Sequence, residues 1–396
     1  MIRVFAFAMA LMGTSAVAAP LLILVSIDGA RWDYPELHGA PFLQELSAAG
    51  TRVERLTPSF PTKTFPNHYT LVTGMRPETH GIVQNRFFDP AFEAWFGIGA
   101  HPAAREGRWW GGEPIWLTAQ RQGLRTACMF WPGSEADILG QHPDTYRRFD
   151  DRLTPADRVD QVLVWTALPT GERPHLITLY FDRVDSAGHD FGPTASETHD
   201  ALIQIDAALA RLRAGLRDQG LWDQTNLIVT ADHGMTESDP ADVAVLDELV
   251  PLDAVESVFS GAVGGLNVVR GDINTWVRQL DAHPHLHAYQ REDVPERLHF
   301  SANPRIPDIV VIPDRGWHLS TRSWIDRDTT PSRGDHGYDP AEPDMGALFI
   351  AHGPSISPGR RFPPADNIHV YNLLCDLLEI TPGENEGDTR LREVLR

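Results

Sequence analysis

Five short apolar runs recur along the chain, and each is bounded by Gly, Pro or Asp. Runs of this length without polar alternation are typical of strands buried on both faces of a parallel sheet. The pattern therefore predicts five buried parallel strands. They are Leu21–Ile27, Thr126–Trp131, His175–Phe181, Asn226–Ala231 and Ala347–Ala351.

Between these runs, apolar positions repeat with the period of an α-helix. The clearest case is Glu197–Gln219, where leucine and isoleucine side chains fall on one face. Helices are also expected over Ala40–Ala49, Glu113–Gln122 and Val370–Leu378. Alternation of strands and helices predicts an α/β fold, in which a doubly wound, mostly parallel sheet carries helices on both faces.

The stretch from about residue 260 to residue 320 has a different pattern. It contains the strand-like segments Leu266–Val269 and Asp308–Pro313, with a helical pattern near Asn274–Gln279 between them. We expect a small α+β lobe inserted into one catalytic domain that covers residues 20–396. The whole chain can equally be described as a single domain.

The first 19 residues have the features of a signal peptide. Arg3 supplies a positive start, Val4–Met12 form an apolar stretch, and the small residues Ala16–Ala19 offer a cleavage site. The alternative is a first core strand or helix. The apolar stretch is too short to span a membrane, and no later segment is long enough. We therefore expect a periplasmic or secreted protein without a membrane span.

Composition narrows the classes of partner and of metal site. The formal net charge is −20, from 34 Lys+Arg against 54 Asp+Glu, which argues against a stable nucleic-acid complex. A small anionic substrate stays possible, because a metal can reverse the charge locally. Cys128 and Cys375 both lie in apolar segments, so a disulfide and two buried free thiols are both open. Two cysteines are too few for a cysteine-based zinc site, so any metal must be bound by histidines and carboxylates.

Three acidic residues lie at or just beyond the ends of predicted strands. Asp28 and Asp232 end their strands, and Asp185 follows His175–Phe181 closely. A single Asp at such a place is commonly a turn or a helix cap. Ligands of open α/β sheets bind at the carboxyl ends of the strands, so three such residues are expected to meet at one edge.

Three histidines accompany these acidic residues. His233 follows Asp232 directly, His189 comes four residues after Asp185, and His336 lies in a glycine-flanked loop. Each histidine alone could be an ordinary loop residue. Three aspartates and three histidines, however, are about the set that two zinc ions need when substrate completes each site. Mixed His and Asp ligands favour zinc over magnesium or calcium.

A candidate nucleophile lies in the segment Pro61–Thr70. Pro66 suits the first turn of a helix, and Thr64 falls where an N-cap is expected. A hydroxyl there faces unpaired amides that attract an anion, and a metal would lower its pKa enough for nucleophilic attack. Considered alone, without the nearby Asp and His motifs, Thr64 would be interpreted as an ordinary helix N-cap.

Taken together, these motifs resemble the nucleotide pyrophosphatase/phosphodiesterase family of the alkaline phosphatase superfamily. The matches follow the order of the family and extend from residue 21 to about residue 380. The matching pieces are Ser26–Gly29, Thr64–His68, Thr79–Ile82 with Asn85, Trp131–Gly133, Asp185–Pro193, Thr230–Met235 and Gly334–Gly337.

The resemblance implies a role for each site residue. One Zn²⁺ would be held by Asp185, His189 and His336, and the other by Asp28, Asp232, His233 and the Thr64 oxygen. One ion would activate Thr64 and the other would stabilise the leaving oxygen, through a phospho-threonine intermediate that water hydrolyses. Asn85 would donate a hydrogen bond to a phosphoryl oxygen.

The resemblance also implies nucleotide-type phosphodiester substrates, hydrolysed to nucleoside 5′-monophosphates. Phe65 and Tyr180 would sandwich the base, although Tyr180 could simply be a core residue of its strand. Two divalent ions would balance three aspartates and a threonine alkoxide, leaving a nearly neutral site that suits a monoanionic diester.

Two alternatives to this activity stay open. One is a phosphodiesterase or phosphomonoesterase of the same superfamily acting on phospholipid head groups or other phosphate esters. The other is a non-enzymatic zinc protein, in which Thr64 and Asn85 would have no purpose. A sulfatase is disfavoured because the chain lacks a Cys/Ser-x-Pro-x-Arg motif.

Overall fold

The computed structural model describes residues 21–98, 102–327 and 332–396. Its centre is an eight-stranded sheet in the order β19-β2-β18-β9-β1-β8-β6-β7. The expected signal peptide over residues 1–19 lies outside the described residues. The strands are β1 Leu21–Ile27, β2 Thr51–Val53, β6 Thr126–Met129, β7 Thr145–Arg147, β8 Leu176–Phe181, β9 Thr225–Thr230, β18 Phe349–His352 and β19 Arg360–Phe362.

The sheet is mostly parallel, as predicted. β1 pairs in parallel with both β8 and β9, and β6 pairs in parallel with β8 and β7. Every residue of β1, β8 and β9 is buried, which explains why these strands read as continuous apolar runs.

One strand direction was predicted wrongly. β18, expected as a parallel strand over Ala347–Ala351, runs antiparallel to both β9 and β2. The chain reaches β18 directly from His336, at the edge where β1 and β9 end, without a helix that crosses back. A strand that enters a sheet from that edge has to run in the opposite direction.

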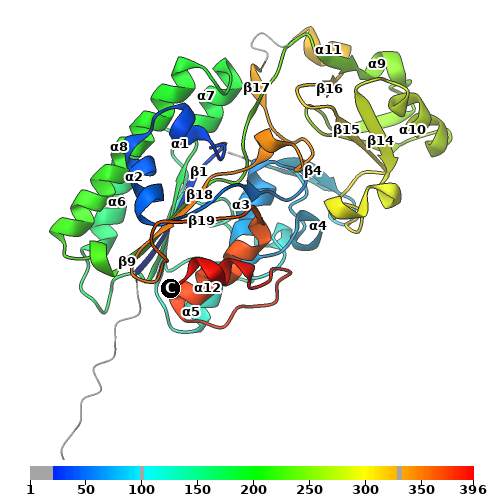
Figure 1. Cartoon of the computed structure of the whole chain (residues 1–396). Coiled ribbons are helices and arrows are strands. Elements are labelled where there is room, and N and C mark those ends of the chain that lie inside the picture. Colours follow the sequence, from blue (N-terminus) through cyan, green and yellow to red (C-terminus); the bar gives the residue numbers. More distant parts are fainter. Residues whose placement is uncertain (1–20, 99–101, 328–331) are drawn as a thin grey trace, which may run out of the picture.

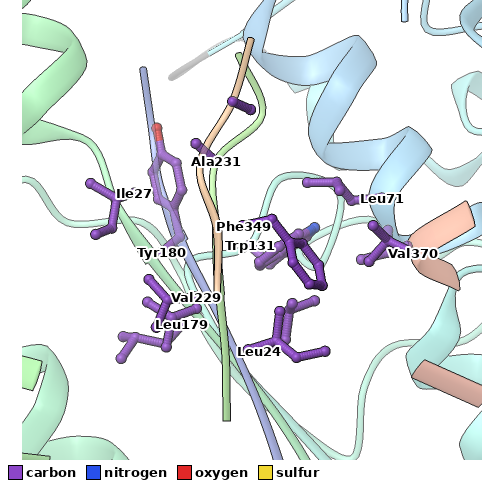
Figure 2. Packing of buried hydrophobic residues seen from close by; sticks show 14 of the residues in the cluster. Leu24, Ile27, Leu71, Trp131, Leu179, Tyr180, Val229, Ala231, Phe349 and Val370 are labelled. Atoms are coloured by element: carbon purple, nitrogen blue, oxygen red, sulfur yellow. The ribbon is translucent and has the colours of Figure 1, made fainter. Parts of the chain in front are cut away.

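Helices cover both faces of the sheet (Figure 1). One layer is α2 Pro41–Ala49, α6 Pro155–Thr166, α7 Arg183–Phe191 and α8 Ser196–Asp218, and the other is α3 Thr64–Thr73, α5 Ile115–Arg121 and α12 Val370–Leu378. Figure 2 shows Leu24, Leu71 and Val370 on one side of the strands, with Ile27, Leu179 and Val229 on the other. The expected α/β class with helices on both faces is confirmed (Figure 1).

A second body of secondary structure spans residues 243–325, which we call the lobe (Figure 1, upper right). Its four-stranded sheet has the order β12-β13-β15-β14. A separate cluster of buried apolar side chains, including Leu266, Leu280 and Val311, forms its core. Its elements are β11 Val243–Val245, α9 Leu246–Leu249, β12 Val255–Phe259, β13 Gly264–Val268, α10 Ile273–Asp281, β14 Leu286–Gln290, β15 Ile309–Pro313, β16 His318–Ser320 and α11 Arg322–Ile325. The division into one catalytic domain with an insertion at about 260–320 stays a prediction.

Two further observations bear on the sequence analysis. Cys128 and Cys375 are both buried and both free. Among the described residues, no helix has the length and hydropathy needed to cross a bilayer.

Candidate metal and phosphoryl-transfer site

The three predicted acidic residues lie together at the carboxyl edge of the sheet. Asp28 follows β1, Asp232 follows β9, and Asp185 is in the first turn of α7, which follows β8. Gly29 has a φ of 68° there, and a Cβ on it would lie 3.0 Å from the Cα of Asp185. Glycine therefore allows α7 to approach β1 closely enough for Asp185 to reach the other two carboxylates.

We call Asp28, Asp232, His233 and Thr64 the inner group. The Nε2 atom of His233 lies 2.8 Å from Asp232 Oδ2 and 3.4 Å from Asp28 Oδ1. The Thr64 hydroxyl lies 3.4 Å from the same nitrogen. All four side chains are buried, so the one nitrogen of His233 faces three oxygen atoms in a place screened from solvent.

We call Asp185, His189 and His336 the outer group. His189 Nε2 lies 3.5 Å from Asp185 Oδ2, and His336 Nε2 lies 3.5 Å from Asp185 Oδ1. Asp185 and His189 are four residues apart on α7 and so share one face of the helix. His336 stacks on His233 with ring centroids 3.5 Å apart, which joins the two groups.

The other ring nitrogen of each histidine has a backbone partner. Nδ1 of His189 lies 2.7 Å from the Gly334 carbonyl, Nδ1 of His233 lies 2.8 Å from the Gly234 carbonyl, and Nδ1 of His336 lies 2.7 Å from the Thr62 carbonyl. A carbonyl only accepts, so each Nδ1 carries a proton and each ring turns its Nε2 toward the carboxylates of the site. This arrangement is the usual support of histidines that bind a metal.

Several buried oxygens of the site lack a hydrogen-bond donor among the described residues. Oδ1 of Asp28 and Oδ1 of Asp185 are buried without a partner. Their separations from imidazole nitrogens, 3.4 and 3.5 Å, match two ligands of a tetrahedral zinc, which lie roughly 3.3–3.6 Å apart. The residues therefore fit metal ions between them.

The pKa shifts point to the same need for positive charge beside these carboxylates. Burial raises the pKa of Asp28 well above its usual value, and the nearby carboxylates of Asp232 and Asp185 raise it further. Burial also opposes the charge of Asp232, but His233 and His68 outweigh it and hold that pKa well below its usual value. Three carboxylates packed this closely need cations to stay ionised together.

Thr64 is the first residue of α3 rather than its N-cap, which corrects the sequence-based prediction. Lys63 is the N-cap, with an extended backbone, and its carbonyl already accepts from the Asn67 amide. Thr64 therefore has helical backbone geometry, and its hydroxyl is not used in capping. Pro66 lies in the first turn as expected. The positive end of the α3 dipole still lies beside Thr64 and favours an anion there.

Asn85 lies next to the start of this helix. The backbone amide of Phe65 donates to Asn85 Oδ1 at 2.9 Å. With its oxygen held by this bond, the side chain keeps its NH₂ group as a donor. Asn85 is therefore placed to donate to an oxygen bound near Thr64.

His68 is a site residue that the sequence analysis did not single out. Its Nδ1 lies 2.9 Å from the Thr64 carbonyl and 3.3 Å from Asp232 Oδ2, and Ser26 of β1 bonds to its Nε2 at 2.8 Å. It lies one helical turn after Thr64, a spacing that could have identified it. Because both ring nitrogens have protein partners, His68 connects α3, which carries Thr64, to β1 and Asp232.

Tyr180 does not present its ring as an open face. The ring is buried, its edge meets His68 at a centroid distance of 5.1 Å, and its hydroxyl donates to Asp28 Oδ2 at 2.5 Å. Tyr180 pairs with Ser26 in register, so its side chain lies on the same side of the sheet as Asp28. Tyr180 therefore supports a carboxylate of the inner group.

Phe149 is the exposed aromatic beside this position. Its ring is 44% exposed and packs against Tyr180 and Phe130, with centroids 6.2 and 5.4 Å away. The buried guanidinium of Arg158 lies 5.7 Å from the ring centroid. Phe65, which the sequence analysis paired with Tyr180 at the base, is partly buried against Phe96 and Trp110. The sequence analysis missed Phe149 because it lies in a loop without a periodic pattern.

Comparison with known proteins identifies the family. The family model described as type I phosphodiesterase / nucleotide pyrophosphatase matches residues 22–339. The chain belongs to this family, as the motifs predicted.

Among curated proteins, the bovine ectonucleotide pyrophosphatase/phosphodiesterase family member 3 is 37% identical over 386 residues. The match covers 93% of this chain and 43% of that protein, so the chain spans less than half the length of this relative.

Two solved structures are similar over their full length. Human ectonucleotide pyrophosphatase / phosphodiesterase 5 has a TM-score of 0.90 and 34% identity, and the match covers 95% of this chain and 100% of that chain. An inactive threonine-to-alanine variant of the murine protein, in complex with AMP, has a TM-score of 0.89 and 32% identity with the same coverage.

Proposed function

We propose that this protein is a two-zinc phosphodiesterase/pyrophosphatase that cleaves nucleotide phosphodiester and phosphoanhydride bonds. The observation that carries the proposal is the pairing of three imidazole Nε2 atoms with carboxylate oxygens beside the Thr64 hydroxyl. Family membership and the AMP complex of the murine neighbour support nucleotide substrates.

The ligand sets follow the two groups. The outer group would hold one zinc through Asp185, His189 and His336, and the inner group would hold the other through Asp28, Asp232 and His233 with the Thr64 oxygen. Mixed nitrogen and oxygen donors favour zinc over magnesium or calcium. When bound, the two ions supply Lewis-acid stabilisation of alkoxide and leaving oxygens.

The side chains of the site then carry out the attack on phosphorus and stabilise the phosphoryl oxygens. Thr64 Oγ1 attacks phosphorus, and the bond to the leaving oxygen breaks as the new P–O bond forms, so the leaving group departs with the electron pair. Asn85 donates to a non-bridging oxygen, and the positive end of the α3 dipole adds to this stabilisation. Water then cleaves the phospho-threonine ester and releases a nucleoside 5′-monophosphate.

The aromatic contact to the base is proposed for Phe65 and Phe149. Phe65 follows the nucleophile directly, and Phe149 presents a substantially exposed ring. Tyr180 is assigned to Asp28 instead, because its hydroxyl is engaged there and its ring is buried.

Thr64→Ala tests the proposed nucleophile. Turnover of a nitrophenyl ester of thymidine monophosphate is expected to fall by about 10³-fold or more, because no other residue can take over as the nucleophile. Metal analysis by mass spectrometry should still find two zinc ions per chain. Rapid quenching of the wild type should trap a nucleotidyl adduct on the peptide that contains Thr64.

Thr73→Ala, at the far end of the same helix, is the matched control and should keep near wild-type turnover. An active Thr64→Ala variant would overturn the phospho-threonine mechanism. Much faster turnover of glycerophosphocholine than of the nucleotide ester by the wild type would overturn the nucleotide assignment.

A further inference from the structure

A cleft of about 780 Å³ opens beside the proposed nucleophile, between the sheet domain and the lobe. Lys63, Asn85 and Arg86 line it from the domain side, and Ser257 to Ser260 with Trp324 line it from the lobe. A volume of this size is typical of small-molecule sites. Because Asn85 belongs both to the cleft and to the proposed reaction site, the cleft continues from the place of phosphoryl transfer.

The lining of the cleft favours an anion. Lys63 and Arg86 are its charged residues, and no Asp or Glu is among the described residues that line it. Lys63 Nζ is paired with Asp335 Oδ1 at 3.1 Å, so Arg86 supplies most of the positive charge that an anion would meet. This lining departs from the rest of a chain whose net charge is −20. Arg86 is held over the Trp95 ring at 3.8 Å, and Lys63 passes over Gly337, where a Cβ would lie 2.5 Å from its Cε.

The lobe contributes a large aromatic ring to the same cleft. Trp324 is 62% exposed although it lies on a short helix that is fixed at its start. The Thr321 hydroxyl caps that helix by accepting from the Trp324 amide, and the Arg327 guanidinium lies 5.3 Å from the ring centroid. An exposed tryptophan on the wall of a cleft is a stacking surface for a planar group.

We propose that this cleft binds the leaving half of the substrate, and that Trp324 stacks on an aromatic base in that half. The proposal rests on the proposed function, since it places the scissile phosphorus at Thr64 and Asn85. Trp324 is then a specificity-determining residue, which favours substrates whose leaving half carries a second base, such as dinucleoside polyphosphates, over substrates whose leaving half carries phosphate charge alone. The hydroxyls of Ser257, Ser260 and Thr321 add hydrogen-bonding groups along the same wall.

The test varies only the leaving group, with adenosine monophosphate as the common transferred half. Diadenosine triphosphate offers charge and a base, and ATP offers charge without a base. Trp324→Ala should lower kcat/KM for diadenosine triphosphate, relative to ATP, by about tenfold.

Two further variants make the result specific to the ring. Trp324→Phe keeps an aromatic face and should restore most of the ratio. Val269→Ala removes a 65% exposed side chain of the lobe that does not line the cleft, and it should leave the ratio at the wild-type value. An unchanged ratio in Trp324→Ala, with an active wild type, would overturn this proposal and leave the proposed function intact.

A binding measurement separates the two proposals. ADP is the leaving group of diadenosine triphosphate, and calorimetry on zinc-loaded Thr64→Ala protein measures its binding without turnover. The Trp324→Ala, Thr64→Ala double variant should bind ADP about tenfold more weakly. Equal ADP affinity in the two proteins contradicts the role of Trp324 whatever the catalytic activity turns out to be.

Discussion

The inner and outer groups use the same kinds of side chain but differ in how they are held. Asp28, Asp232 and His233 are almost completely buried between strand ends and α3. In the outer group the His189 side chain is 31% exposed and that of Asp185 is 17% exposed, whereas that of His336 is 3% exposed. The inner group is therefore part of the packed core, and the outer group reaches the open rim of the site through Asp185 and His189.

The difference follows from the elements that carry each group. Asp28 and Asp232 extend from the neighbouring strands β1 and β9, and His68 and Tyr180 bond to them from α3 and β8. Asp185 and His189 instead project from one face of α7, with carbonyl support from a loop. Buried ligands with several protein partners are held in place before a metal binds, whereas rim ligands rely more on the metal itself.

Removal of one ligand from each group is expected to give the largest effects. His189→Ala and Asp232→Asn should each lower turnover by more than about 100-fold, because even supporting residues of metal ligands commonly cost 10–100-fold. The two variants should differ in stability. His189→Ala should keep nearly the wild-type unfolding free energy without metal, whereas Asp232→Asn should lose stability, since it leaves His233 and His68 without a buried carboxylate.

Chelation of the wild type checks the same contrast without a mutation. Zinc release followed with a colorimetric chelator should occur in two phases, with the outer ion leaving first. Release of both ions in one phase, together with equal stability of the two variants, would mean that burial does not distinguish the groups.

Tyr180→Phe and Phe149→Ala sharpen the comparison at the edge of the inner group. Tyr180→Phe removes the hydroxyl that donates to Asp28, so zinc affinity should fall about 10- to 100-fold. Phe149→Ala removes an exposed ring, so KM for a nucleotide ester should rise about tenfold with metal affinity unchanged. Metal titration and steady-state kinetics measure the two effects separately.

The opposite outcome would restore the sequence-based assignment. If Tyr180→Phe has wild-type zinc affinity and only Tyr180→Ala raises KM, Tyr180 stacks on the base after all. Phe65→Ala is the positive control, because Phe65 is assigned to the base in both interpretations.

The class of fold could be predicted because it depends on local patterns. Continuous apolar runs mark strands that are buried on both faces, and such strands end at a common edge, where Asp28 and Asp232 follow them. The direction of β18 could not be predicted in this way, since it depends on where the chain returns to the sheet. Strand direction is a property of connections rather than of periodicity.

The parts of the site missed from the sequence depend on long-range packing. The bond between Tyr180 and Asp28 follows from the register of β8 against β1, which no local pattern encodes. Phe149 and Trp324 lie in a loop and on a four-residue helix, where exposure is set by packing against distant segments. Aromatic residues in such segments carry no periodic signal.

The smallest expected effect concerns the support of the nucleophile helix. His80 is buried, lies 3.2 Å from the Pro66 carbonyl through Nε2, and accepts from the Ile82 amide through Nδ1. Burial lowers its pKa to about 3. His80 therefore connects α3, which carries Thr64, to the segment that leads from Ile82 to Asn85. It can accept from the Ile82 amide only while its ring is neutral.

Acid should therefore destabilise the fold through His80. In the unfolded chain a histidine takes up a proton near pH 6.5, whereas folded His80 does so only near pH 3, so between these values the unfolded state binds one more proton. The free energy of unfolding falls as the pH falls, by about 1 kcal/mol between pH 6.5 and pH 5.5. Urea unfolding of the metal-free proteins should show this loss as a steeper fall in the wild type than in His80→Gln, which keeps the other buried histidines with lowered pKa values. Thr70→Val removes another partner of His80 but keeps the imidazole, so it should be less stable at every pH with the wild-type slope. Equal slopes in wild type and His80→Gln would show that His80 does not couple acid to the stability of this region.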